Sequence, residues 1–154
     1  MTRLPIILLV DDDEDHLFVA ERAIGRAGVQ AKLCMARDGK EALRVLDQET
    51  ASDSGGPVAL VMLDLRMPGM SGLDMLRRVR ADERTRGVPV VVISSSDRPD
   101  EVRECYAEGA NSYVVKRYDD GSPGTYLADV ARYWVELNEW PEPLGAPVRE
   151  PEAD

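Results

Sequence analysis

Residues 6–16 read Ile-Ile-Leu-Leu-Val-Asp-Asp-Asp-Glu-Asp-His, so that five apolar residues are followed directly by five acidic ones. An uninterrupted apolar run of this length, cut off abruptly, is typical of a buried strand. Consecutive acids ordinarily mark a solvated, disordered segment, yet here they follow residues that favour burial. Either the acids cap and solvate the start of a helix, or a bound cation offsets the repulsion between some of them.

Short apolar runs alternate with segments of helical spacing along the rest of the chain. We expect strands at residues 6–10, 31–35, 58–63, 90–93 and 113–115, and helices at residues 14–27, 39–48, 72–81, 99–108 and 122–139. Strands that are apolar throughout are buried on both faces, which is typical of a parallel sheet covered by helices. The sequence therefore predicts a doubly wound α/β fold with five strands and five helices.

The composition fits one folded domain. The chain has 154 residues, 44% of them hydrophobic, and we expect a domain at residues 1–140 and a Pro-rich acidic tail at residues 141–154. The formal net charge of −10 argues against partners such as nucleic acid or anionic membranes, because these need clustered Lys and Arg. No apolar run approaches the ~20 residues of a membrane helix, so we expect a soluble, cytoplasmic protein.

Polar residues stand at the carboxyl end of four of the expected strands. Asp11 and Asp12 follow the first strand, Asp64 the third, Ser94 the fourth and Lys116 the fifth. Open α/β sheets bind their ligands at this edge, and carboxylates with water supply the roughly six oxygen ligands that Mg²⁺ prefers. A carboxylate beside a metal, with an ammonium and a hydroxyl opposite, can attack phosphorus. The residues therefore predict a magnesium site at which an aspartyl phosphate forms.

The motifs around these residues are highly specific when they are taken together. They are Asp11-Asp12, the segment 64–72 (Asp-Leu-Arg-Met-Pro-Gly-Met-Ser-Gly), the segment 88–96 (Val-Pro-Val-Val-Val-Ile-Ser-Ser-Ser) and the segment 109–116 (Gly-Ala-Asn-Ser-Tyr-Val-Val-Lys). From about Leu4 to Glu139, the chain resembles the receiver domains of two-component response regulators. The resemblance implies a flavodoxin-like fold, with Asp64 as the phosphoacceptor. It also implies that Mg²⁺ is held by Asp11, Asp12, Asp64 and the backbone carbonyl of Arg66.

The same resemblance assigns three further roles. Ser94 corresponds to the hydroxyl that follows the phosphoryl group, Lys116 to the cation that pairs with it, and Tyr113 to the aromatic residue that turns inward on activation. The protein would then be a stand-alone switch or phosphorelay intermediate, phosphorylated by a sensor histidine kinase, and not an enzyme with a separate substrate. The segment 133–141 resembles the end of receivers that accompany bacterial phytochromes, which suggests a bacteriophytochrome as the kinase.

Two positions depart from the family pattern. Receivers usually carry a proline after the lysine, joined by a cis bond, whereas Arg117 follows Lys116 here. A cis bond to another residue type costs about 3 kcal/mol, so this loop is expected to be either trans and rearranged or strained. Arg66 is large and cationic at a position that, in this family, borders the path of the water that removes the phosphoryl group. We therefore predict a long-lived phosphoryl group.

Other roles fit the acids when each is considered alone. Any of Asp11, Asp12 and Asp13 could be a helix N-cap. The run also fits the Asp-x-Asp start of haloacid-dehalogenase-like phosphatases, with Asp11 as nucleophile and Asp13 as acid or base, although that family expects a cap insertion and leaves residues 64–66 unexplained. The single histidine, His16, is expected to be an exposed residue in the first turn of a helix.

Aromatic residues widen the apolar face of the last helix. At 100° per residue this face spans roughly 140°, more than the ≳100° typical of a core-facing helix. It comprises Tyr126, Leu127, Val130, Tyr133, Trp134, Leu137 and Trp140. We therefore predict a homodimer built on this helix, with the tail wrapping the partner and an interface through Tyr126, Tyr133, Trp134 and Trp140. In the alternative, the tail folds back on its own domain and hides these rings.

Overall fold

The computed structural model describes residues 3–51, 56–118 and 123–140 of the chain. The strands are β1 (Ile6–Val10), β2 (Lys32–Ala36), β3 (Val58–Leu63), β4 (Val90–Ser94) and β5 (Ser112–Val115). The helices are α1 (Glu14–Arg26), α2 (Gly39–Ala51), α3 (Gly72–Ala81), α4 (Pro99–Ala107) and α5 (Thr125–Arg132), and α5 continues into the π-helical turn η1 (Tyr133–Leu137). The alternation of strands and helices is therefore confirmed.

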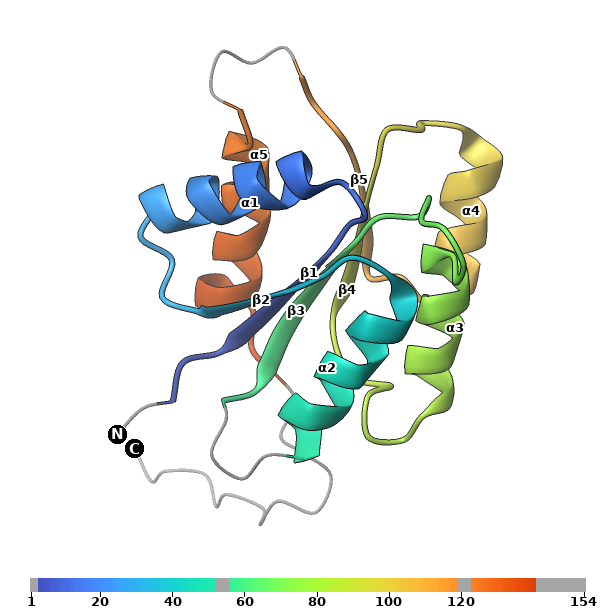
Figure 1. The fold of residues 1–154 in the computed structure, drawn as a ribbon, viewed down its shortest axis with the longest axis horizontal. Helices are drawn as coiled ribbons and strands as arrows, with labels where there is room; N and C mark the ends of the chain where they lie inside the picture. The colour runs from blue at the N-terminus through green and yellow to red at the C-terminus, as the bar shows by residue number, and fades with distance from the viewer. Residues whose placement is uncertain (1–2, 52–55, 119–122, 141–154) are drawn as a thin grey trace, which may run out of the picture.

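The strands form one parallel sheet in the order β2-β1-β3-β4-β5. Helices α1 and α5 cover one face of this sheet, whereas α2, α3 and α4 cover the other (Figure 1). The strand order reverses at β1, which lies between β2 and β3. Doubly wound sheets bind ligands at such a switch point, outside the carboxyl ends of the strands. The order is that of the flavodoxin-like fold, as expected.

Strand β1 is apolar throughout because it serves two cores. Leu8 and Val10 belong to the cluster that packs under α2 and α3, whereas Ile7 and Leu9 belong to the cluster under α1 and α5. All five residues of β1 are buried. Burying one such side chain contributes roughly 1.5–3 kcal/mol, so a charge within the strand would be strongly unfavourable. The first acid therefore comes at Asp11, where the strand ends.

The end of the last helix differs from the expected α-helix. Between Tyr133 and Leu137 the backbone is π-helical, and the Asn138 N–H donates to the Tyr133 carbonyl at 2.8 Å. A π turn takes more residues than an α turn, so the apolar face shifts along the sequence. Val135 therefore packs against the core, whereas Leu137 is 72% exposed. The expectation that Leu137 lies in the core-facing stripe was wrong.

Two further expectations concern the C-terminal tail and the absence of a membrane-spanning helix. The Pro-rich tail at residues 141–154 lies outside the described residues, which end at Trp140, so the domain limit at residue 140 stays a prediction. Within the part of the chain that the structure describes, none of the helices has the length and apolar character needed to cross a membrane.

Candidate functional site

Three carboxylates meet at the carboxyl ends of β1 and β3. The Asp64 N–H donates to the Val10 carbonyl at 2.9 Å, which brings the ends of these two strands level. One oxygen each from Asp11, Asp12 and Asp64 lies within 4.8 Å of the others. Asp11 is 8% exposed and Asp64 9%, whereas Asp12 is open to solvent. The sheet thus concentrates negative charge at its switch point.

The chemistry of this acid cluster fits a hard divalent cation. Mg²⁺ binds oxygen ligands at about 2.1 Å, so ligands on opposite sides of it lie roughly 4.2 Å apart. One oxygen from each of the three carboxylates lies within 4.8 Å of the others, an upper limit close to that value. Asp11 is held in place because its Oδ1 accepts the Asp13 N–H at 3.0 Å. Asp11, Asp12 and Asp64 can therefore hold Mg²⁺ after a small adjustment.

The position of Asp64 depends on close backbone packing. The Gly72 N–H donates to the Leu65 carbonyl at 3.0 Å, and a Cβ at Gly72 would clash with the Asp64 carbonyl oxygen. Only glycine lets α3 begin so near the end of β3. Burial and the charge of Asp11 raise the pKa of Asp64 to about 6, although Lys116 opposes the shift. Without a cation, this carboxyl group therefore holds its proton more tightly than usual.

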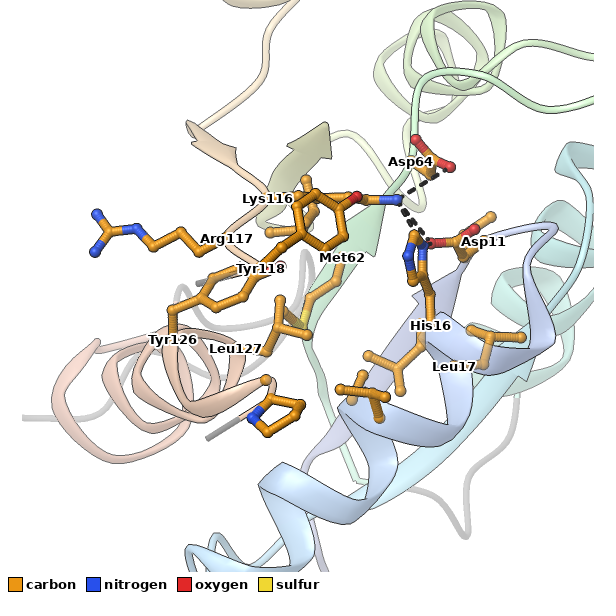
Figure 2. Close-up of a pocket in the computed structure, with 17 residues that line it drawn as sticks. Asp11, His16, Leu17, Met62, Asp64, Lys116, Arg117, Tyr118, Tyr126 and Leu127 are labelled. Atoms are coloured by element: carbon orange, nitrogen blue, oxygen red, sulfur yellow. Dashed lines mark hydrogen bonds and ion pairs between the residues drawn. The ribbon is translucent and has the colours of Figure 1, made fainter. Parts of the chain in front are cut away.

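Lys116 provides the positive charge of the site. Its Nζ lies 3.3 Å from Asp11 Oδ2, 3.6 Å from Asp64 Oδ2 and 2.9 Å from His16 Nδ1. Figure 2 shows its amine pointing toward the two carboxylates. Burial disfavours the charge, but Asp64 and Asp11 outweigh burial and raise the pKa of Lys116. The ammonium is thus ionised and neutralises part of the acid cluster.

The peptide bonds in the described part of the loop after β5 are trans. The bond between Lys116 and Arg117 is not cis, nor is any other peptide bond in the described residues. The Lys116 N–H donates to the Ser94 carbonyl at 2.7 Å, which prolongs the β4–β5 ladder by one residue. Arg117 is exposed and its side chain extends away from Lys116 (Figure 2). The lysine therefore reaches the acids without a proline after it.

His16 belongs to the site, and the expectation that it is merely an exposed helix residue was wrong. Its Nδ1 lies 3.2 Å from Asp11 Oδ2 as well as 2.9 Å from Lys116 Nζ, and its side chain is 33% exposed. It is the third residue of α1, and side chains in a helix tilt toward the N-terminus. The available signal was therefore this tilt, which directs His16 back toward the end of β1.

Ser94 and Tyr113 lie on the β4–β5 side of the site. Ser94 is 2% exposed, and its Oγ accepts the Ser96 N–H at 3.2 Å. Tyr113 packs partly against the α2–α3 core cluster, and its hydroxyl donates to the Ser96 carbonyl at 2.8 Å. The two residues expected to transmit activation thus contact the same loop residue.

Arg66 lies in the loop after β3. Its N–H makes a long contact of 3.5 Å with Asp64 Oδ1. Its guanidinium reaches across to Glu101 of α4 at 3.4 Å, and the side chain is 68% exposed. The Arg66 side chain therefore spans the gap between the loop after β3 and α4.

The four residues expected at a dimer interface differ in their exposure. Tyr126 and Trp134 are partly buried against the core under α1 and α5, whereas Tyr133 is 49% exposed. The half-buried Trp140 turns back, and its Nε1–H donates to the Trp134 carbonyl at 3.0 Å. Up to residue 140 the chain therefore covers part of its own aromatic face, and Tyr133 is the member of this set that is most available.

A cavity of about 270 Å³ lies between α1 and α5 beside the lysine (Figure 2). Its lining is mostly apolar and includes Leu17, Met62 and Leu127, and both His16 and Lys116 also face it. The Lys116 side chain, which is 8% exposed, therefore borders empty space on this side, while its ammonium lies among polar partners.

The chain is similar to known response regulators. The family model described as "Response regulator receiver domain" matches residues 7–122. The probable methanogenesis regulatory protein FilR2 of Methanothrix harundinacea is 34% identical over 138 residues, which cover 90% of this chain and 88% of that protein. The structure of the bacteriophytochrome response regulator RtBRR is 35% identical with a TM-score of 0.68, over 90% of this chain and 85% of that chain. The response regulator RPA3017 "in red light signaling of R. palustris" is 26% identical with a TM-score of 0.77, over 90% and 99% of the two chains.

The phosphatase alternative gains no support from these similarities. Its acid or base would be Asp13, but Asp13 Oδ1 accepts the Asp15 N–H at 2.9 Å and caps α1. The matched region runs from within β1 to beyond β5 and so contains the acid cluster and Lys116. Fold, site and family model therefore agree, and the chain belongs to the response regulator receiver domain family.

Proposed function

We propose that Asp64 accepts a phosphoryl group from a sensor histidine kinase, with Mg²⁺ as the cofactor. The observation that carries this proposal is the meeting of Asp11, Asp12 and Asp64 with the ammonium of Lys116 at the sheet's switch point. The Mg²⁺ ligands would be these three carboxylates and the backbone carbonyl of Arg66. When bound, the ion would neutralise charge on the phosphoryl oxygens and keep Asp64 ionised.

The chemistry assigned to the chain's own residues is a nucleophilic displacement. A carboxylate oxygen of Asp64 forms a bond to phosphorus while the bond from phosphorus to the donor's histidine nitrogen breaks, and that nitrogen keeps the electron pair. Lys116 stabilises the charge on the transferred group, because its ammonium already lies 3.6 Å from Asp64 Oδ2. The protein acts as a switch and not as an enzyme with a separate substrate.

The readout of phosphorylation is assigned to Ser94 and Tyr113. The proposed change begins when the Ser94 hydroxyl donates to a phosphoryl oxygen. That movement disturbs the loop at Ser96, whose N–H donates to Ser94 and whose carbonyl accepts from Tyr113. The new charge is thereby converted into a changed surface along β5 and α4.

A bacteriophytochrome is the proposed kinase class, supported by the similarity to RtBRR. The proposed location is the cytoplasm, in keeping with the acidic and highly charged composition.

The proposed homodimer would pair the ends of the last helices, where Tyr133 and Leu137 are exposed. Sedimentation of the wild-type chain and of a Tyr133→Ser/Leu137→Ser variant tests this contact. A monomeric wild-type chain at high concentration contradicts it.

The phosphoacceptor is tested with acetyl phosphate and Mg²⁺, followed by identification of the labelled residue. We expect one label, on Asp64, and none in an Asp64→Asn variant. Asp13→Asn is the matched control, because Asp13 is an acid of the same run that caps α1. It should be labelled like the wild type. A label on Asp11 would refute the proposal and restore the phosphatase interpretation.

A further inference from the structure

The ammonium of Lys116 has three acceptors around it, and the nearest is not an acid. Its distances are 2.9 Å to His16 Nδ1, 3.3 Å to Asp11 Oδ2 and 3.6 Å to Asp64 Oδ2. The contacts with His16 and Asp11 are within hydrogen-bonding distance, whereas the contact with Asp64 is an ion pair. We propose that His16 is a positioning residue, which holds Lys116 at the phosphoacceptor through the lone pair of Nδ1. This inference rests on the proposed function of Asp64 and Lys116.

The backbone and packing leave Lys116 in need of such a contact. Strand β5 is a four-residue edge strand whose residues are half-buried or exposed, unlike the fully buried β1. The next residue, Arg117, is exposed and joined by a trans bond. The lysine stem also faces the cavity between α1 and α5. The Lys116 side chain is only 8% exposed, but it borders a cavity, so the position of its ammonium depends on its polar contacts. These contacts offset the side-chain entropy that is lost when the lysine is held in one geometry.

The geometry specifies the tautomer of the imidazole. Nδ1 lies near both Lys116 Nζ and Asp11 Oδ2, but a single ring nitrogen either donates or accepts. An ammonium has no lone pair, so the shorter contact requires Nδ1 to accept and the ring proton to sit on Nε2. The 3.2 Å contact to Asp11 Oδ2 is then the distance between two acceptors that share the ammonium.

His16 differs from the other two acceptors in the role that the proposed function assigns to it. Asp11 and Asp64 are assigned to the metal, and Asp64 also to the phosphoryl group. His16 is assigned to neither. Nδ1 is therefore the one acceptor of the three that remains committed to Lys116 throughout phosphorylation. It acts through the lysine and does not contact the phosphoryl group.

The first test reads the tautomer by NMR. The chain contains one histidine, so ¹⁵N–¹H correlation of its ring gives a single, unambiguous pattern. We expect a proton on Nε2 and a lone pair on Nδ1, both in the metal-free protein and with Mg²⁺. In a Lys116→Met variant the pattern should change, because Asp11 then becomes the partner of Nδ1. A proton on Nδ1 in the wild type would overturn the proposal.

The second test uses three substitutions at one position. In His16→Asn the amide oxygen can occupy the place of Nδ1, in His16→Gln it lies nearer the place of Nε2, and in His16→Leu there is no acceptor. Loss of a hydrogen bond to a charged group corresponds to about a tenfold lower maximal rate of phosphorylation by acetyl phosphate. We expect this loss in His16→Leu and His16→Gln, and a rate within about twofold of wild type in His16→Asn. Equal rates in all three variants would contradict the proposal.

A double-mutant cycle separates positioning from general damage to the fold. In a Lys116→Met background, His16→Leu should have little additional effect on the rate, because the group that His16 positions is absent. An undiminished tenfold loss in that background would show that His16 acts by another route. Thermal unfolding of each variant reports any loss of stability. If wild-type Asp64 were not phosphorylated at all, the proposed function would fail, whereas the NMR test would still decide the contact.

Discussion

The acid half and the lysine half of the site are held in different ways. Asp11 and Asp64 follow the central strands β1 and β3, where nearly all residues are buried and the two strands hydrogen-bond directly. Lys116 follows the edge strand β5, which is only partly buried, and its ammonium depends on side-chain contacts. The core therefore positions the acids through the backbone, whereas the lysine requires partners of its own. Substitutions in the two halves should consequently have different effects.

The largest expected difference is in Mg²⁺ affinity. Removing a proposed carboxylate ligand with Asp11→Asn should weaken Mg²⁺ binding at least about 100-fold, because the divalent ion would lose a full negative charge at close range. Lys116→Met should instead tighten binding several-fold, since the ammonium competes for the same oxygens at 3.3 and 3.6 Å. Isothermal titration calorimetry measures both. Weaker Mg²⁺ binding in Lys116→Met would contradict the division of the site into an acid half and a lysine half.

Stability without metal should rise when the charge of Asp64 is removed. The pKa of this carboxyl is raised from 3.8 to about 6, so its ionised form destabilises the folded state. The penalty is absent below pH 3.8, builds up between 3.8 and about 6, and is complete above that value. Asp64→Asn should therefore stabilise the metal-free protein by about 1–3 kcal/mol at neutral pH, since one pKa unit corresponds to about 1.4 kcal/mol.

Denaturant unfolding at neutral and acidic pH measures this gain. Asp12→Asn is the matched control, because Asp12 is exposed and should change stability by less than about 0.5 kcal/mol. Saturating Mg²⁺ should stabilise the wild type and cancel the advantage of Asp64→Asn. An equal gain at pH 3.5 and at pH 7.5 would show that the charge of Asp64 is not the cause.

The pH dependence of metal binding should follow from the same group. A metal ligand must be ionised, so Mg²⁺ competes with the proton that Asp64 holds with a pKa of about 6. Affinity should be nearly constant above pH 7 and fall roughly tenfold by pH 5, with release of up to one proton for each ion bound near pH 6. Calorimetry in two buffers of different ionisation enthalpy detects this proton. Affinity that is flat between pH 7 and 5 would contradict the shift.

The smallest effect is expected at Arg66, which lies outside both halves. It lies in the loop that follows Asp64, and its side chain extends to Glu101 at 3.4 Å. Arg66→Asn should open the path of the attacking water and shorten the lifetime of phosphorylated Asp64 by about 3- to 10-fold. Glu101→Gln, which removes only the partner, should shorten it less. Decay of the labelled protein after removal of acetyl phosphate measures both, and an unchanged rate in Arg66→Asn would disprove the role.

Most of the fold and of the acid cluster could be predicted because they depend on local patterns. The apolar run 6–10 must be buried on both faces, and a parallel sheet aligns the ends of its strands, so Asp11 and Asp64 were expected at the same edge; the pairing of β1 with β3 makes them neighbours. The exposure of Leu137 could not be predicted, because the π turn at residues 133–137 changes the helical period without a sequence signal that we recognised.

The sequence by itself determined the doubly wound sheet and the three carboxylates at its switch point, because both follow from the spacing of apolar and charged residues along the chain. Only the tertiary structure decided how the lysine is held. His16 and Lys116 are separated by 100 positions, and their 2.9 Å contact exists because α1 begins and β5 ends at the carboxyl ends of the strands of one sheet. A contact between side chains so distant in sequence leaves no periodic pattern, so it becomes visible only when the chain is folded.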